Sequence, residues 1–226
     1  MILAAAAASG AELSGTASLG WESRYVFRGA QLAEDVLTPA VNLASGDCYA
    51  GVWMAVPTSG ERYRREADLF AGWSRRIGGV ASVDVGLTRY AYGDFAGDFL
   101  SSEDSLELYA GVTTDLIAFS PSLYLYRDFD AGTVTAELKA GHSFALGGTF
   151  SLDLAAVAGR VDYDEGGDRC YGELAAGFSV TAGKDVSFAL NAHYALSDED
   201  SMFGSRRAPD PGRASFWIGA AVSCAF

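Results

Sequence analysis

The last thirteen residues of the chain, Ala214–Phe226, read ASFWIGAAVSCAF and alternate between two kinds of side chain. Apolar residues such as Phe216 and Ile218 stand at even positions, and small or polar residues such as Ser215 and Ser223 occupy most odd ones. A period of two over this length predicts a β-strand with one apolar face and one small or polar face.

The same alternation recurs along most of the chain. Residues 80–90 and 133–140 repeat it, and no stretch holds a 3.6-residue apolar period long enough to predict a helix. The fold class that follows is all-β. We expect twelve strands, near 13–28, 36–45, 48–57, 63–75, 79–91, 104–114, 117–127, 132–145, 149–161, 170–181, 185–197 and 213–226.

The connections between these strands alternate in length. Tight turns are expected at 45–47, 76–78, 114–116, 146–148 and 182–184. Longer, mostly acidic loops are expected at 29–35, 57–62, 92–103, 128–131, 162–169 and 198–212. Short turns on one rim and loops on the other are typical of an up-and-down barrel.

The alternative to a membrane barrel is a soluble sandwich, which would pair a face of large packed side chains with a densely charged face. Here one face is mainly Gly, Ala, Ser and Thr with about one ionisable group per strand. The other face is apolar, with Tyr and Trp towards the strand ends, where an aromatic girdle is expected. The chain also ends on Phe226 within an apolar-alternating strand, as outer-membrane barrels commonly do. We therefore predict a single antiparallel up-and-down transmembrane β-barrel of about twelve strands.

Length and charge limit the remaining choices. The chain has 226 residues and a formal net charge of −13, which suits one domain with an acidic surface. Such a surface argues against nucleic acid, whose phosphates it would repel. Residues 1–11, MILAAAAASGA, are similar to the end of a signal peptide although they lack a basic segment, and we assign 12–226 to the barrel.

The segment SRYVFRG at 23–29, followed by Gln31 and Pro39, resembles the opening signature of the TorF-type porin family. The resemblance continues through YAGVW at 49–53, EADLFAG at 66–72 and TRYAY at 88–92. It extends through ELYAG at 107–111 and SPSLY at 120–124, and becomes generic after residue 130. The resemblance implies an outer-membrane barrel and brings no established substrate.

In a closed barrel, alternate side chains face lipid or lumen, so the parity of each strand assigns its ionisable groups. This rule predicts eight acids and three bases in the lumen, a sum of −5. The pore-lining candidates are Glu22, Arg24, Arg28, Glu66, Asp68, Asp84, Glu107, Glu137, Lys139, Asp153 and Glu173.

Two interpretations of this set stay open. The carboxylates could line a channel that favours cations, or the arginines could pair with acids on neighbouring strands and plug the interior. Loops 92–103 and 198–212 could fold inward and narrow the pore. The acidic loop 162–168 is superficially similar to a calcium loop, but Gly166 stands where an oxygen ligand belongs, so no metal site is predicted.

Other chemistry finds little support in the sequence. Cys48, Cys170 and Cys224 lie far apart without Cys-x-x-Cys spacing, so no zinc or iron–sulfur site and no cofactor is expected. His193 is predicted in the lumen, too far along its strand from Ser187 and Ser197 to form a nucleophile–base pair, and no Gly-x-Ser-x-Gly element occurs. We expect the protein not to be an enzyme.

The expected protein is an outer-membrane channel of Gram-negative bacteria with both termini on the periplasmic side. It would pass small hydrophilic solutes or ions with a weak preference for cations. Outer-membrane lipid and lipopolysaccharide would surround it, while a homo-oligomer or a protein partner stays open. The alternative is a plugged structural or anchoring barrel that binds a surface or periplasmic partner through its loops.

Overall fold

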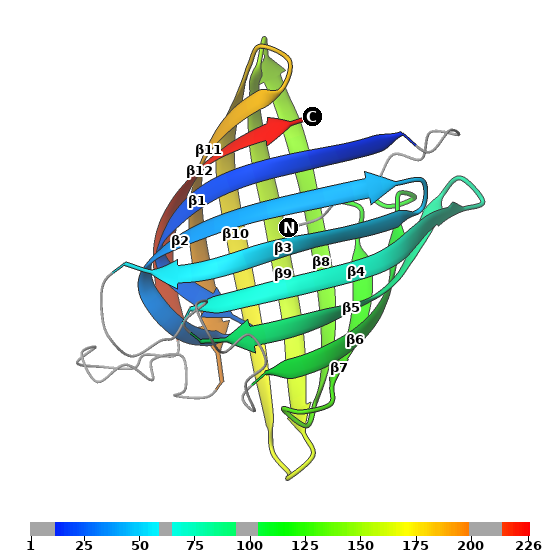
Figure 1. Cartoon of the computed structure of the whole chain (residues 1–226), viewed down its shortest axis with the longest axis vertical. Helices are drawn as coiled ribbons and strands as arrows, with labels where there is room; N and C mark the ends of the chain where they lie inside the picture. The colour runs from blue at the N-terminus through cyan, green and yellow to red at the C-terminus, as the bar shows by residue number, and fades with distance from the viewer. Residues whose placement is uncertain (1–11, 59–64, 94–103, 199–213) are drawn as a thin grey trace.

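The computed structural model describes residues 12–58, 65–93, 104–198 and 214–226, which form twelve β-strands (Figure 1). No helix that could cross a membrane occurs among these residues. The strands are β1 (Leu13–Phe27), β2 (Ala30–Ser45), β3 (Cys48–Pro57), β4 (Glu66–Ile77), β5 (Ala81–Tyr92), β6 (Ser105–Thr114), β7 (Ser122–Asp128), β8 (Thr133–Gly147), β9 (Phe150–Tyr163), β10 (Asp168–Ala182), β11 (Val186–Ser197) and β12 (Ala214–Ala225).

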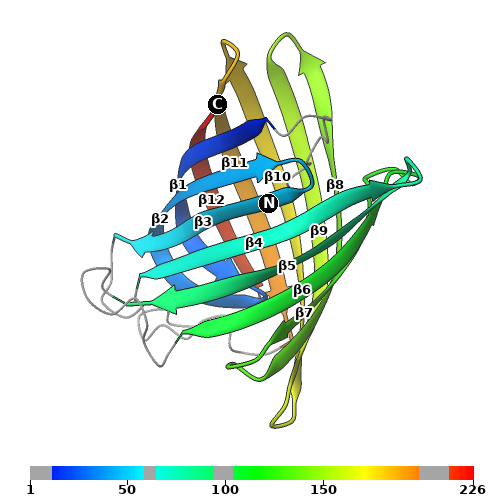
Figure 2. The same cartoon turned by 45° about the vertical axis from the view of Figure 1, so that its right-hand side comes forward.

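The strands close into one antiparallel barrel in chain order (Figures 1 and 2). Each strand pairs with its neighbours in sequence, and β1 closes the ring by pairing with β12, where Gly20 stands opposite Ala221. Closure leaves no unpaired sheet edge. The predicted all-β, twelve-stranded up-and-down barrel is therefore confirmed.

The two rims of the barrel differ in what they carry. At one rim, Gly15 and Phe226 exchange two backbone hydrogen bonds, so the start of β1 and the end of β12 lie together there. The same rim holds short turns around Gly46, Gly79, Gly148 and Gly183, where a positive φ suits glycine. The opposite rim carries the turns and loops that connect β1 to β2, β7 to β8 and β9 to β10. We call these the terminal rim and the loop rim.

The outer surface of the barrel is apolar over its middle. Leu174 on β10 and Leu190 on β11 are more than 60 % exposed although each lies mid-strand. Period-two alternation puts these side chains on the face opposite the interior. Further exposed apolar residues around the barrel are Leu87, Leu108, Leu125, Leu138, Phe178, Phe188, Phe216 and Ile218.

The connection between β1 and β2 differs from the sequence expectation. The predicted loop 29–35 is wrong, because β2 begins at Ala30 and Arg28 with Gly29 forms a two-residue turn. Both residues have positive φ, 48° and 76°, as a type I′ hairpin turn requires. The acidic residues Glu34 and Asp35, which suggested a loop, lie within the strand.

Two other connections also differ from the expected lengths. β7 begins at Ser122 rather than 117, because Phe119 and Ser120 adopt positive φ and Pro121 follows them. β9 extends to Tyr163 and β10 begins at Asp168, so the expected loop 162–169 shortens to 164–167. The predicted strict alternation of short and long connections is therefore wrong for this part of the barrel.

The expected signal segment 1–11 lies outside the described residues, as does most of loops 92–103 and 198–212.

Candidate channel interior

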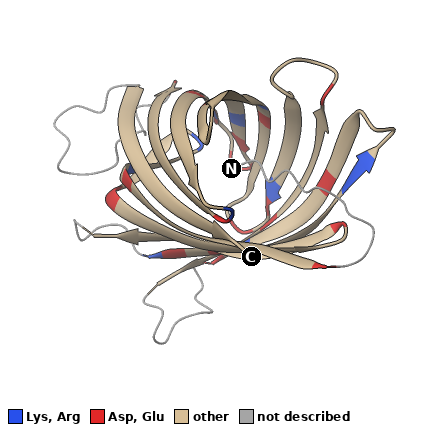
Figure 3. Cartoon of the chain, turned by 90° about the horizontal axis from the view of Figure 1, so that it is seen from above, with Lys and Arg blue, Asp and Glu red and all other residues tan. Residues whose placement is uncertain are grey.

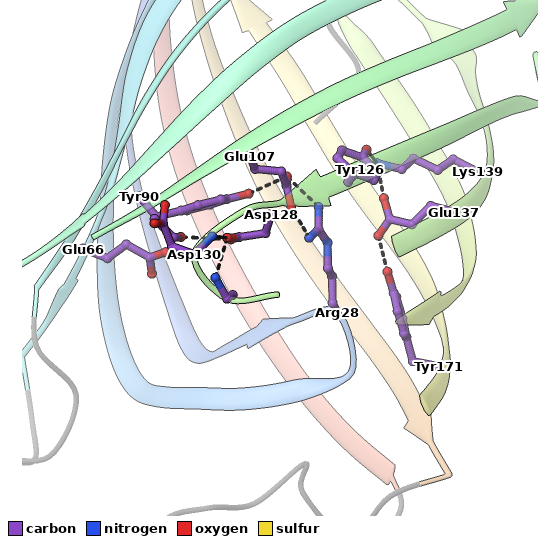
Figure 4. Close-up of polar contacts among 12 residues, drawn as sticks. Arg28, Glu66, Tyr90, Glu107, Tyr126, Asp128, Asp130, Glu137, Lys139 and Tyr171 are labelled. Carbon is purple, nitrogen blue, oxygen red and sulfur yellow. Dashed lines mark hydrogen bonds and ion pairs between the residues drawn. The ribbon is translucent and has the colours of Figure 1, made fainter. Parts of the chain in front are cut away.

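The most direct contact across the barrel joins Arg28 in the β1–β2 turn to Glu107 on β6 (Figure 4). The guanidinium donates two hydrogen bonds, of 2.5 and 2.9 Å, to the two carboxylate oxygens. Tyr90 on β5 donates a third to the same carboxylate at 2.9 Å. Both partners of the ion pair are buried, with Arg28 at 9 % and Glu107 at 1 % side-chain exposure. Since β1 and β6 are not neighbours in the sheet, this pair crosses the interior.

The β1–β2 turn makes further contacts far from its own strands. The Arg28 guanidinium lies 4.3 Å from the ring centroid of Tyr126 on β7, a cation–π geometry. A methyl group on Gly29 would lie 2.5 Å from Cβ of Tyr171 on β10 and 3.3 Å from Oγ of Ser197 on β11. The turn therefore folds into the lumen instead of projecting beyond the loop rim.

Acidic side chains gather beside this ion pair. Glu66 on β4 is 1 % exposed and accepts a hydrogen bond from the Tyr92 hydroxyl at 3.3 Å. Asp68, also on β4, lies next to Glu66 and close enough to Arg28 for electrostatic attraction. A buried carboxylate is costly unless it is paired or hydrogen-bonded, so the Arg28 charge stabilises this region.

A second polar group spans β7, β8 and β10. Lys139 contacts Glu137 at 2.6 Å and donates a hydrogen bond to the Tyr126 hydroxyl at 2.7 Å. The Tyr171 hydroxyl donates a hydrogen bond to Glu137 from the far side (Figure 4). Because Arg28 packs on the same Tyr126 ring, the two groups are continuous across the lumen.

Asp84 on β5 anchors a third group, nearer the terminal rim. Its two carboxylate oxygens accept hydrogen bonds from the hydroxyls of Tyr49 on β3 at 2.7 Å and Tyr124 on β7 at 2.9 Å. The Tyr49 hydroxyl also lies 2.6 Å from that of Tyr109 on β6. These tyrosines come from strands on both sides of β5, so their side chains meet inside the barrel.

A fourth group lies around His193 on β11. Its Nδ1 is 2.9 Å from Glu173, and its ring stacks on Trp217 with centroids 4.8 Å apart. Glu22 on β1 interacts electrostatically with the same histidine across β12. Nearby, Arg24 donates a hydrogen bond to Ser215 at 3.0 Å.

The structure thus places the sequence-selected ionisable residues on the interior face and joins most of them to partners. Asp153, on β9, accepts a hydrogen bond from Ser179 at 3.0 Å. Arg28 alone among the eleven candidates lies in a turn rather than on a strand. Figure 3 views the ring of strands from above and marks the acidic and basic positions along it.

Sequence reasoning missed the tyrosines of the interior. The expectation that tyrosines form a girdle on the outer face is wrong for Tyr49, Tyr109, Tyr124, Tyr126 and Tyr171, which bond interior acids or each other. The positions of glycines on neighbouring strands are the feature that indicates these inward-facing tyrosines. Each of four tyrosines lies directly opposite a glycine on the next strand, in the pairs Tyr49–Gly72, Tyr109–Gly86, Tyr124–Gly111 and Tyr171–Gly159. A Cβ on any of these glycines would overlap the ring.

A cavity of about 330 Å³ lies between the β1–β2 turn and the loop rim. Phe27 and Arg28 of the turn contribute to its lining, opposite Thr135 and Val161 of β8 and β9. Asp104 and Asp128 line it as well, with their carboxylates bonded to Arg89 and Ser105 respectively. The cavity is therefore a polar vestibule that borders on the turn.

Among the described residues of the loop rim, most acidic side chains near the β9–β10 connection are paired with arginines. Asp164 in the β9–β10 connection pairs with Arg127 at 2.6 Å, and Asp162 near the end of β9 pairs with Arg160 at 2.8 Å. The Arg127 guanidinium holds the pKa of the Asp164 carboxyl below its usual range. Within the described chain, Asp168, Cys170 and Asp198 bring ligand atoms within 4.8 Å of one another, a group at the rim that is separate from the lumen.

The fold and its interior define a class of protein: closed twelve-stranded barrels, apolar outside and polar inside. The chain belongs to the Gcw_chp family, described as bacterial protein of unknown function, whose model matches residues 4–224. No curated protein matches the chain in sequence. The TorF-type name itself has no support beyond the sequence resemblance.

Several solved structures share the barrel architecture. The NanC porin, in a rhombohedral crystal form, matches with a TM-score of 0.61 and 10 % identity over 92 % of this chain and 98 % of that one. The outer membrane protein OprD from Pseudomonas aeruginosa matches with a TM-score of 0.42 and 13 % identity over 94 % of this chain and 65 % of its own. Such identities show a shared fold and nothing finer, and the OprD score is too low to carry an argument.

Proposed function

We propose that this protein is a porin-like channel of the bacterial outer membrane through which small hydrophilic solutes diffuse passively. One observation carries the proposal: charged side chains from strands that are not neighbours meet inside a closed barrel whose outside is apolar. An apolar outer band suits lipid, and a polar interior suits water and solutes. The TorF-type resemblance and the shared fold of the NanC porin agree with this function.

The proposed orientation places the terminal rim in the periplasm and the loop rim outside the cell. Short periplasmic turns and longer outer loops are the usual arrangement of such barrels. Residues 1–11 would then be the end of an export signal, and the outer face would contact lipid and lipopolysaccharide. No catalytic role is proposed, since His193 is bonded to Glu173 and stacked on Trp217 instead of facing a nucleophile.

A weak preference for cations follows from the interior charges. The eleven candidates comprise eight acids against Arg24, Arg28 and Lys139. Excess fixed negative charge raises the local concentration of cations in a narrow aqueous path.

A second candidate function is a plugged barrel that serves as a structural element or an anchor. The specific observation in its favour is the β1–β2 turn, which contacts β6, β7 and β10 across the lumen. Such a barrel would bind a surface or periplasmic partner at a rim and conduct nothing.

Planar-bilayer recording of the refolded protein under a salt gradient separates the two functions. A channel gives discrete conductance steps and a reversal potential of the sign set by cation flow. Folding is checked independently by the heat-dependent shift in gel mobility that closed barrels show. A folded barrel without steps would reject the channel and favour the anchor.

A further inference from the structure

We infer that the β1–β2 turn is the constriction of the channel and that Arg28 is the residue that sets its conductance and ion selectivity. The inference rests on the proposed channel function and names the part of the lumen that controls passage. It assigns this part to a two-residue turn at 28–29, rather than to the long loops 92–103 or 198–212.

The β1–β2 turn extends across the lumen to the opposite wall. In a closed ring of twelve strands, β7 lies directly across from β1. The turn that ends β1 reaches this far wall, because the Arg28 guanidinium bonds Glu107 on β6 and packs on Tyr126 of β7. Figure 4 shows Arg28 extending from the turn towards these residues.

The width of the contact is the second argument. Phe27, just before the turn, packs edge-on against Tyr90 of β5 with centroids 5.9 Å apart. On the other side, Gly29 lies against Tyr171 of β10 and Ser197 of β11. The turn and its flanking residue therefore contact β5, β6, β7, β10 and β11, which together line much of the wall.

Burial indicates how little space the turn leaves. Glu107 and Glu66 point into the lumen, yet each is 1 % exposed. The vestibule of about 330 Å³ is bordered by Phe27 and Arg28 on its inner side. A solute that enters from the loop rim therefore meets the turn next.

The charges at this level give Arg28 a second effect. Its guanidinium offsets the carboxylate of Glu107 and attracts those of Asp68 and Glu137. Removing it would leave these carboxylates without their common counter-charge at the narrowest level. Passage should then become both wider and more selective for cations.

The turn geometry supplies a variant that removes the charge and keeps the fold. Arg28 adopts a φ of 48° and precedes Gly29, so Arg28→Asn gives Asn-Gly, a preferred type I′ hairpin sequence. Arg28→Lys keeps the positive charge but replaces a two-pronged contact with Glu107 by a point charge. Arg127→Ala is the matched control, because it removes an arginine from an exposed pair with Asp164 outside the lumen.

The test compares single-channel conductance and reversal potential of these proteins in a planar bilayer under a salt gradient. We expect Arg28→Asn to raise conductance at least about two-fold and to move the reversal potential towards the value for pure cation flow. Arg28→Lys should keep the wild-type reversal potential, and Arg127→Ala should match wild type in both measurements.

The possible results distinguish a failure of the proposed constriction from a failure of the proposed channel. If wild type conducts and Arg28→Asn shares its conductance and selectivity, the constriction is rejected while the channel stands. Equal reversal potentials for Arg28→Lys and Arg28→Asn would also overturn the role of the Arg28 charge. If wild type is silent and Arg28→Asn conducts, the turn plugs the wild-type barrel, so the proposed channel is rejected and the anchor is favoured. Silence of every correctly folded variant rejects the channel and the inference with it.

Discussion

At the scale of single residues, the interior is organised by pairs of tyrosine and glycine. Gly111 on β6 stands directly opposite Tyr124 on β7, and the Tyr124 ring occupies the place of a side chain. This packing holds the Tyr124 hydroxyl against Asp84 on β5. Because Gly111 has no Cβ, the Tyr124 ring can lie over β6 and its hydroxyl can reach Asp84 on β5.

Gly111→Ala is therefore expected to destabilise the barrel by about 1–3 kcal/mol, because the added methyl group overpacks against the ring. Gly172→Ala on β10 is the control, since an added Cβ there has no neighbour closer than 3.6 Å. Denaturant unfolding in detergent or lipid measures both. Equal stabilities for the two variants would show that packing of the Tyr124 ring does not depend on glycine at position 111.

At the scale of the strands, period-two alternation gives each element a lipid-type face and an interior face. On β11, Leu190 projects outward at 65 % exposure, whereas His193 points inward to Glu173. The alternation holds because neighbouring strands are paired along nearly their full length.

Leu190→Lys should cost about 2–4 kcal/mol in lipid, because it places a charge on the outer face near the middle of a strand. Leu116→Lys is the comparison, since Leu116 is 73 % exposed in the connection between β6 and β7 at the terminal rim. Folding efficiency and unfolding free energy in lipid vesicles provide the measurement. A similar loss of unfolding free energy in both variants would contradict the assignment of the Leu190 side chain to the lipid-facing surface.

At the scale of the whole molecule, the interior charges act together. Charges beyond the Arg28–Glu107 pair also contribute to the potential along the lumen. Three polar groups around Arg28, Asp84 and His193 lie at different levels between the loop rim and the terminal rim. Each level should contribute to ion selectivity.

Asp84→Asn should move the reversal potential towards zero, since it removes one interior charge while its side-chain oxygen can still accept a bond from a tyrosine. Asp115→Asn is the control, because Asp115 pairs with Arg76 at the exposed terminal rim. Bilayer recordings under the same gradient compare them. If Asp115→Asn shifts selectivity as much as Asp84→Asn, the interior potential is not the cause.

The sequence by itself determined the fold class and the number of strands, and strand parity predicts an interior position for the selected ionisable residues. It could do so because side-chain direction alternates strictly along a strand, so parity can be counted without knowing any partner. Ten of the eleven candidates, from Glu22 on β1 to Glu173 on β10, lie on strands where this counting applies, whereas Arg28 lies in the β1–β2 turn.

Only the tertiary structure decided which of these residues meet. Arg28 and Glu107 are 79 positions apart, and no local pattern links them. The acidic residues Glu34 and Asp35 favour a loop between β1 and β2, whereas closure of the barrel brings a tight turn at Arg28 and Gly29 against the opposite wall. The tyrosines likewise turn inward because glycines on the neighbouring strands leave room for their rings, a property of register between strands that one strand cannot reveal.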